Sequence, residues 1–396
     1  MRILVVCQYY KPEPFRLSDV CEALAARGHA VTVVTGTPNY PMGEVYPGYE
    51  GDAHRDEVSG GVRIHRCPIH PRKRGAFHRF WNYYSFVWAS RRYLARLEEP
   101  FDVVFVNQLS PVMMAESALW YARRHGLKTV LYCLDLWPES LTAGGIRPGS
   151  PVYGLFRATS RRIYRRADEI LVTSRGFIPY FREVLGLETD NIRYLPQYAE
   201  ELFGDVPPVR THPAPYRFLF AGNIGEQQSV ETILAAAREV EDDHRIRIDI
   251  VGDGSALPRC REIAEGLSNV TFHGRRDVSE MPALYAGADA MLVTMKDEPL
   301  LSRTLPGKVQ SYLAAGRAVV GAINGETAEV IAAAKCGACV AAEDSHALAL
   351  ELRALAEHPE QLAVCGANAK RYYRENFQKE AFMETLTDAL ERCAAR

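Results

Sequence analysis

Glycines at the ends of two predicted strands indicate a place where a phosphate group could approach the backbone. The strand at 217–221 runs into Gly222-Asn223-Ile224-Gly225, and a helix opens near Ser229. The strand at 246–251 ends in Gly252-Asp253-Gly254. Free N–H groups at a helix start attract anions, and glycine lets a ligand come close. Glycine also serves tight turns, but two such loops at one sheet edge favour ligand binding.

A polar loop that ends at Lys308 adds the positive charge that a diphosphate requires. A predicted strand stops at Thr294, and a helix then begins through Pro306, whose missing N–H suits a first turn. The side chains that could meet a diphosphate here are Ser302, Arg303, Thr304 and Lys308. Hydroxyls, cations and a helix N-terminus together indicate a diphosphate site. The alternative is a solvated loop with ordinary surface charges.

Two carboxylates follow a buried strand in the first half of the chain. The segment CLDLWPES (133–140) places Asp135 and Glu139 at the carboxyl end of the strand at 128–133. Asp135 is the first candidate for accepting a proton from a substrate hydroxyl or for orienting a sugar, and Glu139 is the second. The structural alternative is a helix N-cap followed by an acidic first turn.

Alternating strands and helices position these residues. In the first half, a strand at 2–7, a helix at 18–27 and a strand at 30–35 form a βαβ unit, which implies a parallel sheet. A second α/β series begins at 217. The sequence therefore predicts an α/β protein with two Rossmann-like, doubly wound parallel-sheet domains that face a cleft. The expected divisions are an N-terminal domain (1–203), a proline-rich linker (204–216), a C-terminal domain (217–377) and a final helix (378–396) that could cross back.

Composition excludes several classes of protein. The 396 residues are 47% hydrophobic and 24% charged with a net charge of −2, which argues against nucleic-acid binding. No apolar run reaches the roughly 20 residues of a membrane helix, and the start reads as a strand rather than a signal peptide, so we expect a cytosolic protein. Cys336 and Cys339 lack a second ligand pair and predict a turn that leads into a strand at Val340, not a zinc site. No Asp-x-Asp motif is present, so we expect no metal ion and no cofactor.

A basic, aromatic stretch stands apart from the rest of the first half. Residues 70–97 contain seven Lys or Arg and no acid, with aromatic residues at helical spacing. The aromatic residues are Phe77, Phe80, Trp81, Tyr84 and Trp88, and a second basic helix carries Arg157, Arg161, Arg162, Arg165 and Arg166. This pattern fits an anionic membrane surface. It equally fits an aromatic stripe that faces the core beneath a solvated basic face.

The chain resembles family 4 glycosyltransferases of the GT-B fold over nearly its whole length. The opening QYYKPEPFRLSDVCEALAARGHAVTVVTGTPNYP is similar to the bacterial surface-polysaccharide branch of that family. FLFAGNIG, IDIVGDG, VTFHGRR, LYAGADAMLV and PGKVQSYLAAGRAVV match its C-domain landmarks in order. Within the branch, the chain looks like transferases of the N-acetyl-L-fucosamine (WbuB-like) type.

The resemblance implies roles for particular positions. The loop of Gly222, Asn223 and Gly225 would lie against the donor phosphates, and the regions of Gly252 and Arg275 would line the nucleotide base. The loop from Glu298 to Lys308 would cradle sugar and diphosphate. Lys11 and Arg16, in the loop after the first strand, would face the acceptor. The implied reaction moves a sugar, an N-acetylated deoxyhexose, from a UDP-sugar to a polyprenyl-diphosphate-linked saccharide at the inner membrane face, with retention of configuration.

Two departures from the family pattern leave alternatives open. Asn223 and Gln228 stand where many members have Arg and Lys, and Arg303 and Ser311 replace two glutamates that lie eight positions apart. The carboxylate that binds the ribose hydroxyls would then come from another residue, such as Glu298 or Glu329. A nucleotide-sugar epimerase, or a sugar-nucleotide binder without activity, remains an alternative to a transferase.

Overall fold

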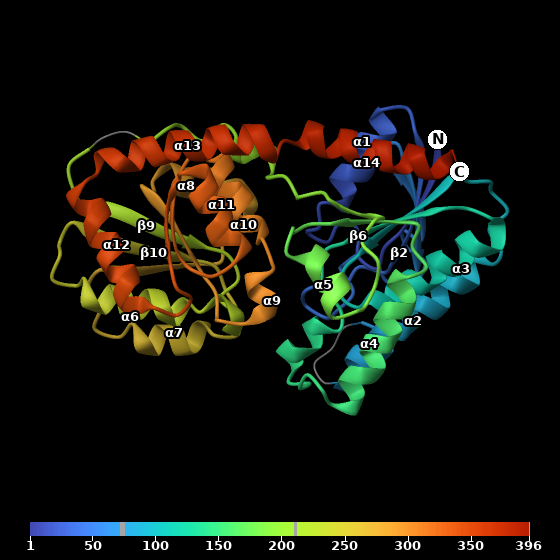
Figure 1. The fold of residues 1–396 in the computed structure, drawn as a ribbon. Helices are drawn as coiled ribbons and strands as arrows, with labels where there is room; N and C mark the ends of the chain where they lie inside the picture. Colours follow the sequence, from blue (N-terminus) through green and yellow to red (C-terminus); the bar gives the residue numbers. More distant parts are fainter. Residues whose placement is uncertain (72–75, 210–211, 396) are drawn as a thin grey trace. The chain divides into compact units, whose positions relative to one another are not determined.

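The computed structural model describes residues 1–71, 76–209 and 212–395, and the side chains of 76–80 and 143–144 lie outside that description. The chain forms two compact units, of which unit 1 comprises Met1–Leu195 with Met383–Arg396, and unit 2 comprises Pro196–Phe382 (Figure 1). The chain thus enters unit 2 before the proline-rich segment. It returns to unit 1 within its last helix, α14 (Lys379–Ala394).

Unit 1 is built on an eight-stranded sheet in the order β3-β4-β2-β1-β5-β6-β7-β8. All neighbouring strands are parallel except β3 and β4. The strands are β1 (Arg2–Val6), β2 (Ala30–Gly36), β3 (Asp56–Ser59), β4 (Val62–Cys67), β5 (Val103–Gln108), β6 (Thr129–Cys133), β7 (Glu169–Val172) and β8 (Ile192–Tyr194). The strands β5, β6 and β7 are buried along their whole length, as expected for parallel strands covered on both faces.

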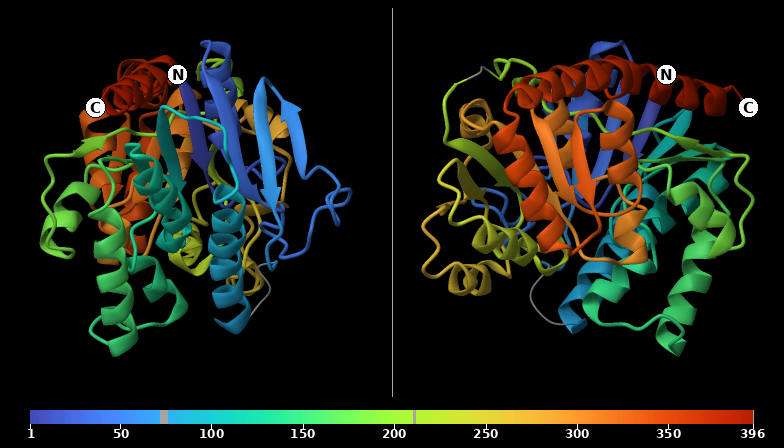
Figure 2. Two further views of the ribbon diagram at one scale, coloured as in Figure 1. Left: turned by 90° about the vertical axis from the view of Figure 1, so that its right-hand side faces the viewer. Right: turned by 60° about the vertical axis from the view of Figure 1, so that its left-hand side comes forward.

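Helices cover both faces of this sheet. α1 and α14 lie on one side, while α2, α3 and α4 lie on the other (Figures 1 and 2). Their bounds are α1 (Leu17–Ala26), α2 (Ala76–Leu94), α3 (Glu116–His125) and α4 (Pro151–Tyr164), with the shorter α5 (Phe177–Glu183) before β8. Short 3-10 helices occupy Val112–Ala115 and Glu139–Gly144.

Unit 2 has a six-stranded, fully parallel sheet in the order β11-β10-β9-β12-β13-β14. Its strands are β9 (Tyr216–Ala221), β10 (Ile246–Val251), β11 (Val270–Gly274), β12 (Ala290–Thr294), β13 (Ala318–Ala322) and β14 (Gly337–Val340). Its helices are α6 (Val230–Glu239), α7 (Leu257–Ile263), α8 (Met281–Ala286), α9 (Pro299–Ser302), α10 (Gly307–Ala314), α11 (Glu326–Ala334), α12 (Ser345–Glu357) and α13 (Glu360–Asn376). Two apolar clusters hold helices against opposite faces of the sheet.

The structure confirms the α/β class and two parallel-sheet units, and it corrects details. The antiparallel pair β3–β4 was not predicted, and the strand expected at Val340 begins earlier, at Gly337, as β14. Cys339 lies inside β14 and Cys336 is buried just before it, rather than both lying in a turn. Among the described residues, no group of three or more His, Cys, Asp or Glu side chains could hold a metal ion.

Among the parallel strands of each sheet, the strand order reverses direction at one place. In unit 1 it lies between β1 and β5, and in unit 2 between β9 and β12. Loops at the carboxyl ends of such neighbouring strands diverge and leave room for a ligand. The glycine loop that starts at Gly222 follows β9, and the loop that ends at Lys308 follows β12. The strand order therefore places at this position the same two loops, from Gly222 and to Lys308, that the sequence predicted to bind a diphosphate.

Candidate functional site

Two glycines of unit 2 bring separate loops into backbone contact. The N–H of Gly222 donates to Val251 O at 3.0 Å, and the N–H of Gly252 donates to Gly274 O at 2.9 Å. Gly222 and Gly252 have φ angles of +145° and +141°, a region that side chains disfavour. A Cβ on Gly252 would lie 1.8 Å from Gly222 O. Glycine at position 252 is therefore required for the loops after β9 and β10 to lie together, and the φ of Gly222 favours glycine there as well.

This contact predicts that Gly252→Ala destabilises unit 2 by roughly 3 kcal/mol or more, since a rigid backbone oxygen blocks the methyl group. Gly266→Ala is the matched control, because Gly266 also has a positive φ of +83° but meets no atom within 4 Å. The control is expected to cost only about 1–2 kcal/mol. Urea unfolding of both variants checks the difference, and equal losses would contradict the proposed steric cause.

Lys308 places a cation directly over the glycine loop. Its Nζ lies 2.6 Å from Gln228 Oε1 and 4.1 Å from the centroid of the Phe220 ring. A Cβ on Gly222 would be 3.0 Å from the same nitrogen. Burial lowers the pKa of the Lys308 ammonium from 10.5 to about 7. Within the described part of the chain, Lys308 forms no ion pair, so its charge is available to an anion.

The other side chains of the loop that ends at Lys308 are less available for contact with a diphosphate. The hydroxyls of Ser302 and Thr304 donate to Glu298 O (3.3 Å) and Leu300 O (2.9 Å), so their protons are used inside α9 and the turn after it. Arg303 and Glu298 are partly buried. The structure brings these residues together but leaves backbone N–H groups and Lys308 as the direct candidates for contact with a diphosphate.

The more distant donor-side candidates are exposed, and one unpredicted carboxylate joins the site. Asn223 and Arg275 are exposed at the ends of β9 and β11. Glu329 is also exposed, whereas the Oε2 of Glu200 accepts from the Ser311 hydroxyl at 3.4 Å. Ser311 is one of the two positions where the family resemblance implies a glutamate. Sequence reasoning missed Glu200, because only the fold brings residues 111 positions apart into contact.

In unit 1, the two predicted catalytic carboxylates have different surroundings. Asp135 is partly buried directly after β6, and its Oδ2 accepts the Ser110 N–H at 3.1 Å. Glu139 opens the following 3-10 helix and accepts a short hydrogen bond from the Tyr153 hydroxyl. The carboxylate of Glu139 also contributes to raising the pKa of Tyr153, for which burial is the larger cause. Glu139 is thus engaged by a neighbouring phenol, while Asp135 is held at the sheet edge by a backbone group.

The two predicted acceptor-side cations are held by their own unit. The Lys11 ammonium forms an ion pair with Glu22 and donates to the Ser59 hydroxyl at 2.8 Å. Arg16, just before α1, is partly buried, and its charge opposes the rise that burial causes in the pKa of Tyr132. Lys11 therefore contacts α1 and β3, whereas Arg16 lies near the carboxyl end of β6.

Glu13 is a buried carboxylate that the sequence did not reveal. Its Oε1 accepts the N–H groups of Asn39 (2.8 Å) and Tyr40 (2.7 Å), and its Oε2 accepts that of Tyr10 (3.1 Å). Glu13 thereby joins the loop after β1 to the loop after β2. Burial raises the pKa of Glu13 from 4.5 to about 7, although these hydrogen bonds oppose the rise. The only sequence signal was an acid between two prolines.

The raised pKa of Glu13 predicts a specific pH dependence of folding. The stability contributed by its protonated form is complete below the unfolded pKa of 4.5 and is lost as the pH rises through 7. The free energy of unfolding of the wild type, relative to Glu13→Gln, should therefore fall by about 2–3 kcal/mol between pH 5 and pH 8. Urea unfolding at both pH values measures this difference, and a constant difference would contradict it.

Comparison with known proteins identifies the two parts of the chain. Residues 15–197 match the family described as a glycosyl transferase 4-like domain, and residues 215–358 match glycosyl transferases group 1. WcaI from Escherichia coli (strain K12), named a putative colanic acid biosynthesis glycosyl transferase, is 28% identical over 336 residues, covering 80% of this chain and 82% of WcaI. WbjE from Pseudomonas aeruginosa, named a probable glycosyltransferase, is 27% identical over 208 residues, which cover 49% of this chain and 51% of WbjE.

Solved structures share the fold along the whole chain. Sucrose-phosphate synthase from Thermosynechococcus elongatus has a TM-score of 0.77 and 17% identity, covering 100% of this chain and 99% of that protein. HepE from Anabaena, in complex with UDP, has a TM-score of 0.71 and 12% identity, covering 99% and 100% of the two chains. The chain therefore consists of a glycosyl transferase 4-like domain followed by a group 1 domain, and it is a glycosyltransferase of the GT-B fold.

Proposed function

We propose that this glycosyltransferase uses a UDP-sugar donor bound by unit 2. The observation that carries the proposal is Lys308, a cation without a carboxylate partner in the described structure, placed over the glycine loop at the β9–β12 switch point. A diphosphate would pair with this ammonium and with the N–H groups of that loop. HepE, which has the same fold, has been solved with UDP and with UDP-glucose. The remaining donor contacts are assigned to Arg275, Glu298 and Arg303.

The proposed acceptor is a polyprenyl-diphosphate-linked saccharide in surface polysaccharide assembly, and the proposed sugar is an N-acetylated deoxyhexose. The relative WcaI, named for colanic acid biosynthesis, supports this class of product. Transfer would proceed with retention, with the departing diphosphate helping to deprotonate the acceptor hydroxyl. Stabilisation of that diphosphate by Lys308 would then supply much of the catalysis.

Association with the cytoplasmic face of the membrane is proposed for unit 1. Among the described helices, none is both long and apolar enough to span a bilayer. Large apolar side chains are nevertheless exposed on α2 and α4, namely Trp81, Trp88, Val152 and Leu155. Trp81 and Trp88 lie in edge-to-face contact, with ring centroids 5.7 Å apart. Of the other aromatic residues that suggested membrane contact, the side chains of Phe77 and Phe80 lie outside the described residues.

A thermal-shift screen of UDP-sugars tests the donor proposal. A ligand that binds only the folded protein raises its melting temperature, and a Kd a hundredfold below the ligand concentration adds about 2.7 kcal/mol. We expect UDP and at least one UDP-N-acetyl sugar to stabilise the protein, while GDP and CMP do not. Conversion of the stabilising UDP-sugar without any acceptor would instead indicate an epimerase. Stabilisation by GDP-sugars alone would contradict the proposed donor.

A further inference from the structure

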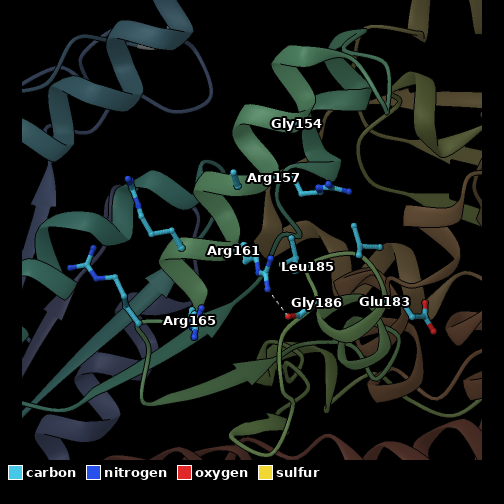
Figure 3. A pocket seen from close by; sticks show the side chains of 11 residues that line it. Gly154, Arg157, Arg161, Arg165, Glu183, Leu185 and Gly186 are labelled. Carbon is cyan, nitrogen blue, oxygen red and sulfur yellow. Dashed lines mark hydrogen bonds between the residues drawn. The ribbon is translucent and has the colours of Figure 1, made fainter.

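A groove of about 770 Å³ lies on unit 1, where α4 faces the turn that follows α5 (Figure 3). The sequence from 151 to 167 contains five arginines and no acid, although the whole chain has a net charge of −2. All five arginines line the groove, together with a single acid, Glu183. Such a concentration of charge is not explained by composition, and the catalytic candidates of unit 1 do not line the groove.

The arginines divide into two groups by their partners. Arg162 and Arg166 both form ion pairs with Glu116, at 2.6 and 2.8 Å. Arg157 and Arg165 are exposed and form no ion pair within the described residues. Arg161 points toward the turn after α5 and donates to Gly186 O at 3.3 Å (Figure 3). Three arginines, at positions i, i+4 and i+8 of one helix face, therefore lack a carboxylate partner in the part of the chain that the structure describes.

Small residues on α4 leave space between these cations. Gly154 lines the groove four positions before Ala158, and a Cβ on Gly154 would meet no atom within 4 Å. Glycine is not needed there for backbone geometry, since Gly154 lies in the helix interior with an ordinary φ. The absent side chain keeps open a space that is rimmed by guanidinium groups, which bind phosphate oxygens in a planar, bidentate manner.

Apolar exposure on the helix that carries the groove points to the kind of molecule that carries the phosphate. Val152 and Leu155 are 49% and 66% exposed on the first turns of the same helix. A soluble phosphate compound gives no reason for exposed aliphatic side chains on the helix that lines a cationic groove. A membrane surface does, because it presents phosphates and acyl chains at adjacent depths.

We propose that this groove of α4 and the α5–β8 turn binds the phosphate of an anionic phospholipid head group. The proposal rests on the membrane association proposed above. It adds a defined phosphate site to the general attraction between basic side chains and an anionic membrane. Arg157, Arg161 and Arg165 hold the phosphate, while Val152 and Leu155 contact the acyl region. UDP binding occurs in unit 2 and does not depend on this groove.

Flotation with vesicles of phosphatidylglycerol and phosphatidylcholine tests the site. The double variant R157Q/R165Q should bind these vesicles on the order of 30-fold more weakly, because each cation at an anionic surface contributes about fivefold. R261Q/R374Q, which removes two exposed arginines from unit 2, is the charge-matched control and should bind like the wild type. Both double variants should keep wild-type UDP binding, so a failure of the donor proposal would be seen separately.

A second variant distinguishes a groove from diffuse charge. G154Q/A158Q fills the space and keeps every arginine, so it should also weaken vesicle binding, by at least about fivefold. Unchanged binding by G154Q/A158Q would overturn the proposal in favour of diffuse attraction. The wild type could instead fail to bind the vesicles and be stabilised by inorganic pyrophosphate, with R157Q/R165Q abolishing that stabilisation. This result would assign the groove to a soluble phosphate compound and would also overturn the proposal.

Discussion

Lys308→Met is expected to weaken UDP binding by roughly 100-fold, the loss typical of one charged hydrogen-bonding partner worth up to about 3 kcal/mol. The ammonium of Lys308 lies over the glycine loop, where it donates to the neutral Gln228 side chain and lies against the Phe220 ring. Methionine has a similar length and packs against the same ring without a charge. Titration calorimetry with UDP measures the change.

The pH dependence of the same binding reaction provides a sharper test. The pKa of Lys308 is about 7 in the free protein, and a bound diphosphate should raise it because the negative charge favours the ammonium. Binding then requires proton uptake above pH 7, so UDP affinity should fall on the order of tenfold from pH 7 to pH 8.5. Phosphate monoesters ionise near pH 6, so the charge of UDP is nearly constant in this range. The Lys308→Met variant should show no such fall.

Lys308→Met should also raise the melting temperature of the ligand-free protein. The folded-state pKa lies below the unfolded value of 10.5, so the cost of burying the ammonium is complete below pH 7 and declines as the pH rises toward 10.5. Each kcal/mol removed corresponds to about 2–4 °C for a unit of this size. Lys128→Met removes a more exposed lysine, paired with Asp168 in unit 1, and serves as the control. UDP affinity that is equal in Lys308→Met and wild type would refute the phosphate role.

The frame of the site could be predicted from the sequence because its signals are local. Buried parallel strands such as β5 and β6 appear as continuous apolar runs, and Gly222 and Gly252 follow strands directly. Strand order then places the two predicted loops side by side without any further information. The start of the short edge strand β14 was missed because four partly buried residues give no periodic pattern; the sequence indicated a strand only at its last residue, Val340.

The contacts within the site could not be predicted in the same way. Gln228 meets Lys308 across 80 positions, and Glu200 meets Ser311 across 111. Neither pair has a local pattern, because each depends on where the fold returns the chain. Lys11 shows the same limit: its position after β1 predicts contact with the acceptor, whereas its ion pair with Glu22 and its hydrogen bond to Ser59 appear only in the fold. A charged side chain near a site can be assigned a role in binding only when its ion-pair and hydrogen-bond partners are known.

Asp135→Asn is expected to lower kcat for sugar transfer by roughly 100-fold, within the range that acid–base groups contribute. Asparagine keeps an oxygen for the Ser110 N–H, so the loop after β6 should retain its conformation. The loss would then reflect the carboxylate's charge in accepting a proton or orienting the acceptor. KM for the UDP-sugar should stay unchanged, because the donor is assigned to unit 2. Initial rates at saturating donor and acceptor measure the effect.

Glu139→Gln is the matched comparison, because it neutralises the other candidate carboxylate four positions away. Glu139 already accepts a hydrogen bond from the Tyr153 hydroxyl, and a glutamine oxygen can accept the same bond. We therefore expect less than a tenfold loss of kcat from this variant, since a group engaged by a buried phenol is a poor proton acceptor. If Glu139→Gln instead lost activity as severely as Asp135→Asn, the two carboxylates would act as a unit. If only Glu139→Gln lost activity, the catalytic role would pass to Glu139, and Asp135 would be left with the structural role of holding Ser110.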